Sequence, residues 1–324
     1  MEKQCKLVNS AIGAQLSKVE EYLFQTLSSQ GIEAHVNAMC MHVVRAGGKR
    51  LRPSLALAAA YALGNLSIAE EDIIKFAAAT ELLHTATLIH DDVIDVADVR
   101  RGNPTLNATD GNHAAVLAGD YMFTRCFFAL QNLPDLFKIS SEAVTALVSG
   151  ELAQLEKVGD LNLSIADYEQ TIYCKTGALF VLATTGIAIH TKQDPQIIDA
   201  LKIYGTKLGI GFQVVDDILD YTSDSHHLGK TVGEDLTDGR ITLPLIFCRD
   251  ELKGTDLENF KNSVENCDLK KVLEFLDKTN AQERCHNFAR KAAQEAILAL
   301  KVLPPSSYRE LLESFAYKAI ERTN

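Results

Sequence analysis

The chain has 324 residues, of which 47% are hydrophobic, so it is long enough to bury a large core. Its formal net charge of −11 leaves no excess of cations to displace counterions from phosphates, which excludes nucleic acid as a partner. Seven cysteines, with no pair spaced as CxxC, favour a reducing compartment over a disulfide framework.

Helical periodicity recurs along nearly the whole chain, and no stretch alternates convincingly as a strand. Pro134 and Pro195 lie near expected helix starts, where the missing N–H is tolerated, and Ser164 with Asp167 resembles a capping box. The expected helices span residues 4–28, 33–45, 53–63, 68–96, 112–131, 135–157, 164–190, 194–222, 242–252, 268–278, 280–302 and 306–322. The sequence therefore predicts an all-α protein of about twelve or thirteen helices.

No low-complexity linker divides the chain, so residues 1–324 are expected to form a single domain. The polar start, Met1–Lys6, gives no sign of a signal peptide. The longest apolar runs, Leu55–Leu63 and Gly177–Ile189, fall short of a bilayer span. We therefore expect a soluble, cytoplasmic protein.

Two acidic clusters share the spacing DDxxD, and each follows an apolar helical stretch. The first cluster is Asp91, Asp92 and Asp95, and the second is Asp216, Asp217 and Asp220. Residues four apart share a helix face, so the first and last carboxylates of each cluster repel one another. The irregular segments 97–111 and 223–240 follow the clusters, which suggests two long helices ending at a shared mouth. Bound cations would remove the repulsion, whereas a solvated acidic helix end is the alternative interpretation for one cluster alone.

Clustered cations are informative in so acidic a chain. Lys49, Arg50 and Arg52 follow two glycines at an expected helix start, where flexible backbone and exposed N–H groups favour anions. Further groups lie at Arg100 and Arg101, at Lys175 and Thr176, and at Lys230 and Arg240. Mg²⁺ prefers a few carboxylates together with substrate phosphates. The sequence therefore predicts a magnesium site for diphosphate-bearing molecules, and two basic groupings suggest two diphosphates.

These groups belong to an ordered series of short motifs. The series is Gly47-Gly48-Lys49-Arg50-Leu51-Arg52-Pro53, Glu81-Leu82-Leu83-His84, His90-Asp91-Asp92-Val93-Ile94-Asp95, Arg100-Arg101-Gly102, Gly119-Asp120, Gly150-Glu151, Lys175-Thr176, Phe212-Gln213-Val214-Val215-Asp216-Asp217-Ile218-Leu219-Asp220, Gly229-Lys230, Asp235-Leu236 and Thr242-Leu243-Pro244. In this order and spacing, over about residues 30–320, the chain resembles the trans-prenyl diphosphate synthases of the polyprenyl synthetase family. The resemblance implies a single-domain helical bundle of the isoprenoid synthase type around a central cavity, and a homodimer.

The resemblance also implies a role for each matching residue. Isopentenyl diphosphate would be bound by Lys49, Arg52, His84 and Arg101. The allylic diphosphate would be bound by Arg100, Lys175, Thr176, Gln213 and Lys230, with Arg240 where relatives commonly carry lysine. Mg²⁺ ions, about three with substrate bound, would be held by Asp91, Asp92, Asp95, Asp216, Asp217 and Asp220. These aspartates and Lys175 would be the catalytic groups. The sequence departs from the family at Val96, where relatives often show an acidic residue.

The implied reaction begins with ionisation of the allylic C–O bond, because metal ions and basic side chains stabilise the departing diphosphate. The double bond of isopentenyl diphosphate then attacks head to tail, and a proton is lost to the released diphosphate. A dry apolar cavity keeps water from the carbocation. The allylic substrate is expected to be farnesyl diphosphate, and the lipid product allows at most peripheral membrane contact.

Product length is expected to depend on Ala86 and Thr87, about one helical turn before Asp91. Bulky aromatic residues at these positions stop growth early in the resembling family, whereas here both residues are small. We therefore expect a medium- or long-chain product, with octaprenyl favoured over farnesyl or geranylgeranyl. Alternatively, Ala86 only permits close helix packing. Candidate deeper stoppers are Phe123, Phe127, Phe128 and Phe137, although such spacing is also typical of a plain core.

Three other interpretations are less favoured. A terpene cyclase also uses a DDxxD cluster, but it lacks the basic loop with Lys49 and Arg52 and a second cluster of this form. A regulatory subunit of a heteromeric synthase would typically have lost the acidic motifs, and both are intact here. An EF-hand is excluded because its alternating ligand order is missing.

Overall fold

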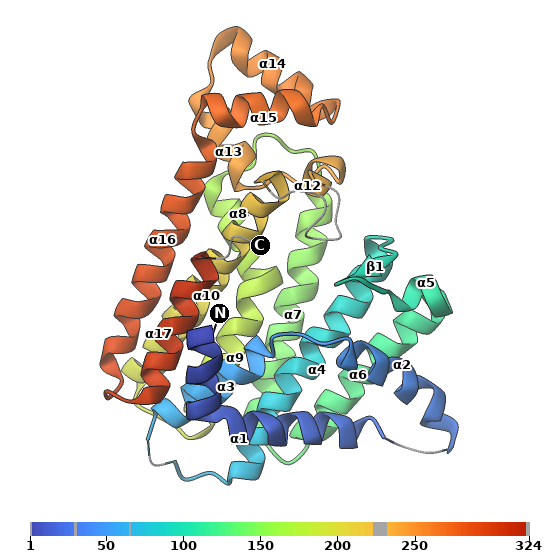
Figure 1. The fold of residues 1–324 in the computed structure, drawn as a ribbon, viewed down its shortest axis with the longest axis vertical. Helices are drawn as coiled ribbons and strands as arrows, with labels where there is room; N and C mark the ends of the chain where they lie inside the picture. The colour runs from blue at the N-terminus through green and yellow to red at the C-terminus, as the bar shows by residue number, and fades with distance from the viewer. Residues whose placement is uncertain (1, 29–30, 65, 223–231, 322–324) are drawn as a thin grey trace. The chain divides into compact units, whose positions relative to one another are not determined.

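The computed structural model describes residues 2–28, 31–64, 66–222 and 232–321 (Figure 1). The α-helices are α1 (Glu2–Thr26), α2 (Ala34–Arg45), α3 (Leu51–Ala62), α4 (Glu70–Ile94), α5 (Leu106–Asp110), α6 (Asn112–Leu130), α7 (Pro134–Glu156), α8 (Ile165–Ile172), α9 (Ala178–His190), α10 (Pro195–Thr222), α12 (Glu234–Thr237), α13 (Leu243–Glu251), α14 (Gly254–Glu265), α15 (Leu269–Lys278), α16 (Ala281–Ala299) and α17 (Ser307–Ile320). They are accompanied by the 3₁₀ helices η1 (Gly31–Glu33) and η3 (Leu300–Val302), the π-helical turn η2 (Tyr173–Gly177) and the antiparallel strands β1 (Val99–Arg100) and β2 (Asn103–Pro104). The all-α prediction is confirmed.

Several elements differ from the prediction. Helix α14 was not predicted because its sequence is mostly polar, although its apolar residues Leu257, Phe260 and Val264 have the i, i+3, i+7 spacing of a helix. The short helices α5 and α12 and the two-residue strands were also missed, since such elements carry too few residues for a periodic signal. The expected helix 164–190 is interrupted by the π-helical turn η2.

The chain divides into two compact units. Unit 1 contains residues 1–144, 179–202 and 300–314, and unit 2 contains residues 145–178, 203–299 and 315–324. The single domain with a central cavity therefore stays a prediction.

Unit 1 has α4 at its centre, packed against α6, α3 and α1 (Figure 1). Helix α4 can be surrounded because its middle, Ala77–Thr80, is small and buried. A close approach of α6 occurs at Gly119, where a Cβ atom would lie 2.4 Å from His90 Nε2. Packing thus fixes the end of α4 that carries the first acidic cluster.

Unit 2 has a core formed by α13, α15 and α16, to which α10 contributes one face. Val214, Val215 and Ile218 of α10 are buried in this core. Because these apolar residues recur at helical spacing, Asp216 and Asp220 lie together on another face of the same helix. The helical period therefore separates the core of unit 2 from its acidic side chains.

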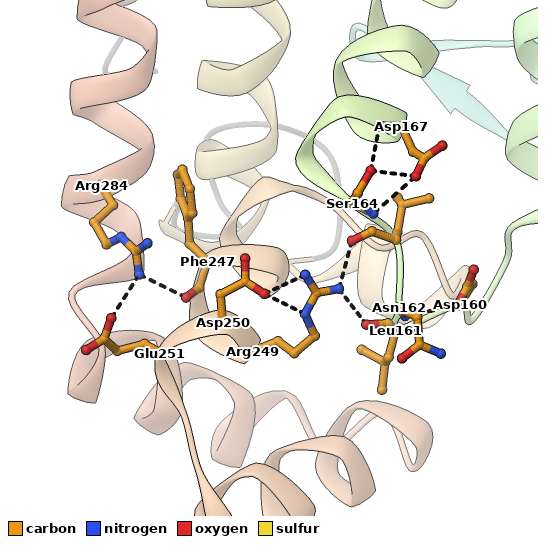
Figure 2. Close-up of polar contacts among 11 residues, drawn as sticks. Asp160, Leu161, Asn162, Ser164, Asp167, Phe247, Arg249, Asp250, Glu251 and Arg284 are labelled. Atoms are coloured by element: carbon orange, nitrogen blue, oxygen red, sulfur yellow. Dashed lines mark hydrogen bonds and ion pairs between the residues drawn. The ribbon is translucent and has the colours of Figure 1, made fainter.

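The segment before α8 is fixed by Arg249 of α13 (Figure 2). Its Nη1 donates to the carbonyl oxygens of Leu161 at 2.6 Å and Leu163 at 2.7 Å, and Asp250 binds the same guanidinium. Ser164 and Asp167 then form the predicted capping box at the start of α8. The N-terminus of α8 is therefore held on both sides.

The stretch Ile165–His190 is the one candidate membrane span within the described residues, long and apolar enough by length and composition alone. The expectation from uninterrupted apolar runs had placed no stretch in this class. In the structure, 72% of its most apolar window is buried inside the protein, as in the core helix of a globular protein.

Candidate functional site

The basic turn before α3 separates three cations that are adjacent in the sequence. Gly47 has φ of +91° and Arg50 a left-handed φ of 45°, so the chain turns sharply before α3 begins at Leu51. Arg50 is only 8% exposed, and its Nη1 donates to Glu81 Oε1 at 2.9 Å and its Nη2 to the Val44 carbonyl at 2.8 Å. Arg50 is therefore already paired within the fold, and its ion pair with Glu81 stabilises the turn. Lys49 is exposed.

His84 of α4 lies within the positive field of four arginines. Burial, followed by the charges of Arg52, Arg101, Arg100 and Arg50, lowers the pKa of His84 well below its ordinary value, so the ring is neutral at pH 7. Neutral imidazole still donates one hydrogen bond. A concentration of cations around an uncharged donor is a local environment that favours an anion.

Each of these arginines has a fixed position. The Arg52 guanidinium lies over the Phe180 ring at 5.0 Å, and Arg101 Nη1 donates to the Gly47 carbonyl. Arg100 Nε donates to Asp92 Oδ1 at 2.5 Å. Together with His84 and Asp92, Arg100 and Arg101 line a solvent-open hollow of about 580 Å³ in unit 1.

The first acidic cluster lies at the C-terminus of α4. Asp95 caps the helix, Val96 adopts a left-handed φ of 51°, and the Ala97 N–H donates to the Asp92 carbonyl at 2.9 Å. This reversal, a Schellman turn, leads into β1 and returns Arg100 to Asp92. Asp92 is therefore buried and ion-paired, whereas Asp91 is half-buried and Asp95 is exposed.

Lys175 and Thr176 lie in the π-helical turn η2, which adds one residue to a helical turn. Lys175 Nζ is 2.8 Å from Glu151 Oε2 and donates to Gln154 Oε1 at 2.8 Å, both on α7. Thr176 Oγ1 donates to Gln213 Oε1 on α10 at 2.7 Å. This half-buried lysine is thus paired, within unit 2, with a glutamate and an amide.

The second acidic cluster contains a carboxylate held by neutral donors. Asp217 is 3% exposed; Tyr168 Oη donates to its Oδ2 at 2.5 Å and Gln213 Nε2 to its Oδ1 at 3.0 Å. Burial, with the nearby charge of Asp235, raises the pKa of Asp217 well above its ordinary value. Hydrogen bonds thus connect Tyr168, Asp217, Gln213 and Thr176 in one series.

Asp220 is also electrostatically strained. Burial and the charge of Asp235 raise its pKa to about 7, although the Asp235 N–H donates to Asp220 Oδ2 at 3.2 Å. Arg240 approaches Asp235 at 3.6 Å and Asp238 at 3.3 Å. Several carboxylates in close proximity, opposed by few cations, create a site to which a divalent cation is suited.

In unit 2 a solvent-open hollow brings several of the predicted residues together. Its lining includes Lys175, Thr176, Gln213, Asp217 and Arg240. Lys230 was also predicted to bind the allylic substrate, but it lies outside the described residues.

The lining also contains residues to which sequence analysis gave no role. Tyr168, Gln154 and Asp235 belong to this group. Glu151, which pairs with Lys175, also had no assigned role, but it lies outside the lining. Tyr168 and Gln154 carried no motif, whereas Gly150-Glu151 and Asp235-Leu236 were motifs without an assigned function.

The polyprenyl synthetase family model matches residues 33–276. The chain belongs to the polyprenyl synthetase family. It is 37% identical to the all-trans-nonaprenyl-diphosphate synthase (geranyl-diphosphate specific) of Rhodobacter capsulatus over 96% of both chains. It is 38% identical to the octaprenyl diphosphate synthase of Escherichia coli over 89% of this chain and 90% of that one.

A solved structure is similar over nearly the whole chain. The polyprenyl synthase of Caulobacter crescentus, complexed with calcium and isoprenyl diphosphate, has a TM-score of 0.88, 33% identity and 98% coverage of both chains. The relatives confirm the predicted activity: the chain is a trans-prenyltransferase of the medium- and long-chain polyprenyl synthetases.

The residues expected to control product length differ in their surroundings. Ala86 is fully buried, and Thr87 Oγ1 donates to the His84 carbonyl at 2.8 Å. The Phe127 and Phe137 rings lie 5.3 Å apart. Phe128 is 59% exposed, which is unlike a residue that closes a cavity within unit 1.

The acidic residues fit a hard divalent cation, because their donors are carboxylate oxygens. Among the described residues, no three His, Cys, Asp or Glu side chains form a metal site by themselves. Mg²⁺ is usually bound in proteins by one or two carboxylates and completes its coordination with water and substrate phosphates.

Proposed function

We propose that this polyprenyl synthetase uses Mg²⁺ to condense isopentenyl diphosphate head to tail onto an allylic diphosphate, with farnesyl diphosphate preferred and octaprenyl diphosphate as the product. Support comes from the octaprenyl and nonaprenyl synthases among its relatives, and from the calcium and isoprenyl diphosphate bound by the similar structure. The carrying observation is the neutral His84 among four arginines in a chain of net charge −11.

Isopentenyl diphosphate binds the basic groups of unit 1 in this proposal. Lys49, Arg52 and Arg101 supply charge, and His84 donates a hydrogen bond without adding charge of its own. Arginine matches phosphate oxygens with paired N–H groups, and those of Arg52 and Arg101 are already oriented by Phe180 and Gly47.

The allylic diphosphate binds Arg100, Lys175, Thr176, Gln213, Lys230 and Arg240. Mg²⁺ would be held by Asp91 and Asp95 of the first cluster and by Asp216 and Asp220 of the second, and would supply positive charge against which the diphosphate can leave. Asp92 and Asp217 act differently from the other four, because they alone of the six are buried, with Arg100 and Tyr168 bound to them. These two carboxylates orient their clusters.

The residues of the chain then perform three tasks. Lys175 and Arg100 stabilise the charge that develops on the diphosphate when the allylic C–O bond breaks. The basic groups of unit 1 hold isopentenyl diphosphate so that its double bond forms the new C–C bond. The proton released from the adduct passes to the diphosphate. Apolar side chains keep water from the carbocation.

A homodimer, a single domain and a cytoplasmic location are also part of the proposal. One face of α7 in unit 2 exposes Val148, Leu152 and Leu155 by 56%, 57% and 52%. Their i, i+4, i+7 spacing makes one apolar stripe, the kind of surface that a second copy covers.

Purified protein incubated with farnesyl diphosphate, isopentenyl diphosphate and Mg²⁺ should release diphosphate and give octaprenyl diphosphate when the products are sized. Each substrate alone should give no elongation. Release from the allylic substrate alone, with a cyclised product, would contradict the proposal. Ala86→Phe should shorten the product, because a bulky ring then fills the space one turn before Asp91; an unchanged product distribution would exclude Ala86 from control of length.

A further inference from the structure

The π-helical turn that carries Lys175 presses against α7 at a glycine. A Cβ atom on Gly150 would lie 2.4 Å from Cys174 Cβ and 3.3 Å from the Lys175 backbone nitrogen. A glycine inside a helix lowers stability relative to alanine, so it needs a compensating reason. Here the reason is contact: only glycine lets the bulging backbone of η2 come so close to α7.

This close approach sets the position of the Lys175 side chain. An ammonium group has three N–H donors. The carboxylate of Glu151 and the amide oxygen of Gln154 each lie 2.8 Å from Lys175 Nζ, and they follow Gly150 by one and four residues. Lys175 and Gln154 line the hollow of unit 2, whereas Glu151 is outside the described lining. Glu151 therefore contacts Lys175 from outside this lining.

We propose that Glu151 is a positioning residue for the transferase reaction: with Gly150 and Gln154 it holds the Lys175 ammonium so that its remaining N–H meets the allylic diphosphate. This rests on the proposed role of Lys175 as a ligand of that diphosphate. A free lysine side chain samples many rotamers, and this rotamer entropy is lost on binding unless the side chain is already fixed.

The charge of Glu151 has a second effect. The same hollow is lined by Asp217 and Asp235, which also attract an ammonium group. Glu151, with 19% of its side chain exposed, and Lys175, with 27%, are shielded enough for their attraction to compete with those carboxylates. Glu151 thus keeps the lysine on the α7 side of the hollow, away from the acidic residues.

The test is a double-mutant cycle in the full-length enzyme with Mg²⁺. Glu151→Gln should raise the KM for the allylic diphosphate by about tenfold and leave that for isopentenyl diphosphate within about twofold. Lys175→Ala should raise the allylic KM further. In the Lys175→Ala background, Glu151→Gln should add less than about twofold, because a residue that acts through Lys175 has nothing left to position.

Conservative and control variants separate positioning from folding. Glu151→Asp should remove about a third of the increase in the allylic KM that Glu151→Gln causes, since it keeps the charge on a shorter side chain. Glu142→Gln removes a glutamate from the same helix, paired with Lys138 at 3.9 Å and 64% exposed, and should leave both KM values unchanged. Melting temperatures of all variants show which of them remain folded.

Gly150→Ala tests the positioning of Lys175 by changing the backbone contact between α7 and η2 instead of the charge of Glu151. The added methyl group should displace the π-helical turn and raise the allylic KM, whereas Gly211→Ala, whose Cβ would have 3.5 Å to its nearest neighbour, should not. If Lys175→Ala loses allylic affinity but Glu151→Gln and Gly150→Ala do not, the positioning role is overturned and the proposed function stands. Equal effects of Glu151→Gln in both backgrounds would overturn it too. An unchanged allylic KM in Lys175→Ala would overturn the assignment of Lys175 itself.

Discussion

The two acidic clusters have the same DDxxD spacing, yet the protein holds them in different electrostatic environments. The central carboxylate of the first cluster, Asp92, is ion-paired with Arg100 at 2.5 Å. The central carboxylate of the second, Asp217, is bound by the neutral donors Tyr168 and Gln213. Identical spacing therefore fixes which side chains share a helix face but not what stabilises their charge.

The surroundings extend this difference. Near the first cluster, burial and then the charges of the arginines lower the pKa of His84. Near the second, burial and then the charge of Asp235 raise the pKa values of Asp217 and Asp220. A cation bound by the second cluster therefore relieves more repulsion than one bound by the first. We infer that Mg²⁺ changes the stability of unit 2 more than that of unit 1.

The largest effects should come from the carboxylates that are proposed to bind metal. Asp91→Asn or Asp216→Asn should lower turnover by at least about a hundredfold, as the loss of one electrostatic stabiliser does in other enzymes. Steady-state assays at saturating Mg²⁺, with a check that the melting temperature is retained, measure this. A near-normal rate in either variant would refute the metal assignment of that cluster.

Substitution of the two central carboxylates should lower the free energy of unfolding by different amounts. Asp92→Asn leaves the Arg100 cation without its partner and should lower the free energy of unfolding by about 2–3 kcal/mol, since Arg100 is partly exposed. Asp217→Asn removes a charge whose pKa is already raised by burial and should cost less than about 1 kcal/mol. Urea unfolding in EDTA compares the two variants; equal losses would show that the clusters are held alike.

The raised pKa of Asp220 predicts a pH dependence for the metal-free protein. The pKa is 3.8 in the ordinary state and about 7 in the folded one, so the favourable contribution is complete below about pH 4 and is lost as the pH rises through 7. Asp220→Asn should therefore stabilise the protein at pH 8 by about 1–2 kcal/mol, because solvent partly screens the charge, and have little effect at pH 4. Thermal unfolding in EDTA at both pH values measures the difference. A stabilisation that is equal at pH 4 and pH 8 would contradict the raised pKa.

The sequence alone predicted the helices and the two acidic clusters, because helical periodicity and motif spacing can be read directly from it. Helical spacing indicates two faces on α10: a buried one with Val214, Val215 and Ile218, and an acidic one. The order of the short motifs indicated the family, which the relatives confirm.

What sequence could not give was side-chain partnership between distant residues. Arg50 is next to Lys49 in the chain but bonds Glu81, and nothing local distinguishes it from Arg52. The bonds of Tyr168 to Asp217 and of Lys175 to Glu151 depend on packing between helices and on a π-helical turn. No periodic pattern encodes such a turn, because it differs from an α-helix by a single inserted residue.

The smallest effect on stability should come from a substitution at Val96, directly after the first cluster. The second cluster lies inside α10, which continues to Thr222. The first is followed directly by Val96 in a left-handed conformation. A left-handed backbone conformation at a branched residue destabilises the folded protein by about 1–2 kcal/mol. Glycine removes this strain, but its greater conformational entropy in the unfolded chain offsets about half of the gain. Val96→Gly should therefore raise the free energy of unfolding by about 0.5–1 kcal/mol, measured by urea titration. Val93→Gly, in the helical part of α4, is the matched control and should lower it by a similar amount. A loss of stability in Val96→Gly would mean that the valine side chain contributes more through its contacts than its backbone conformation costs.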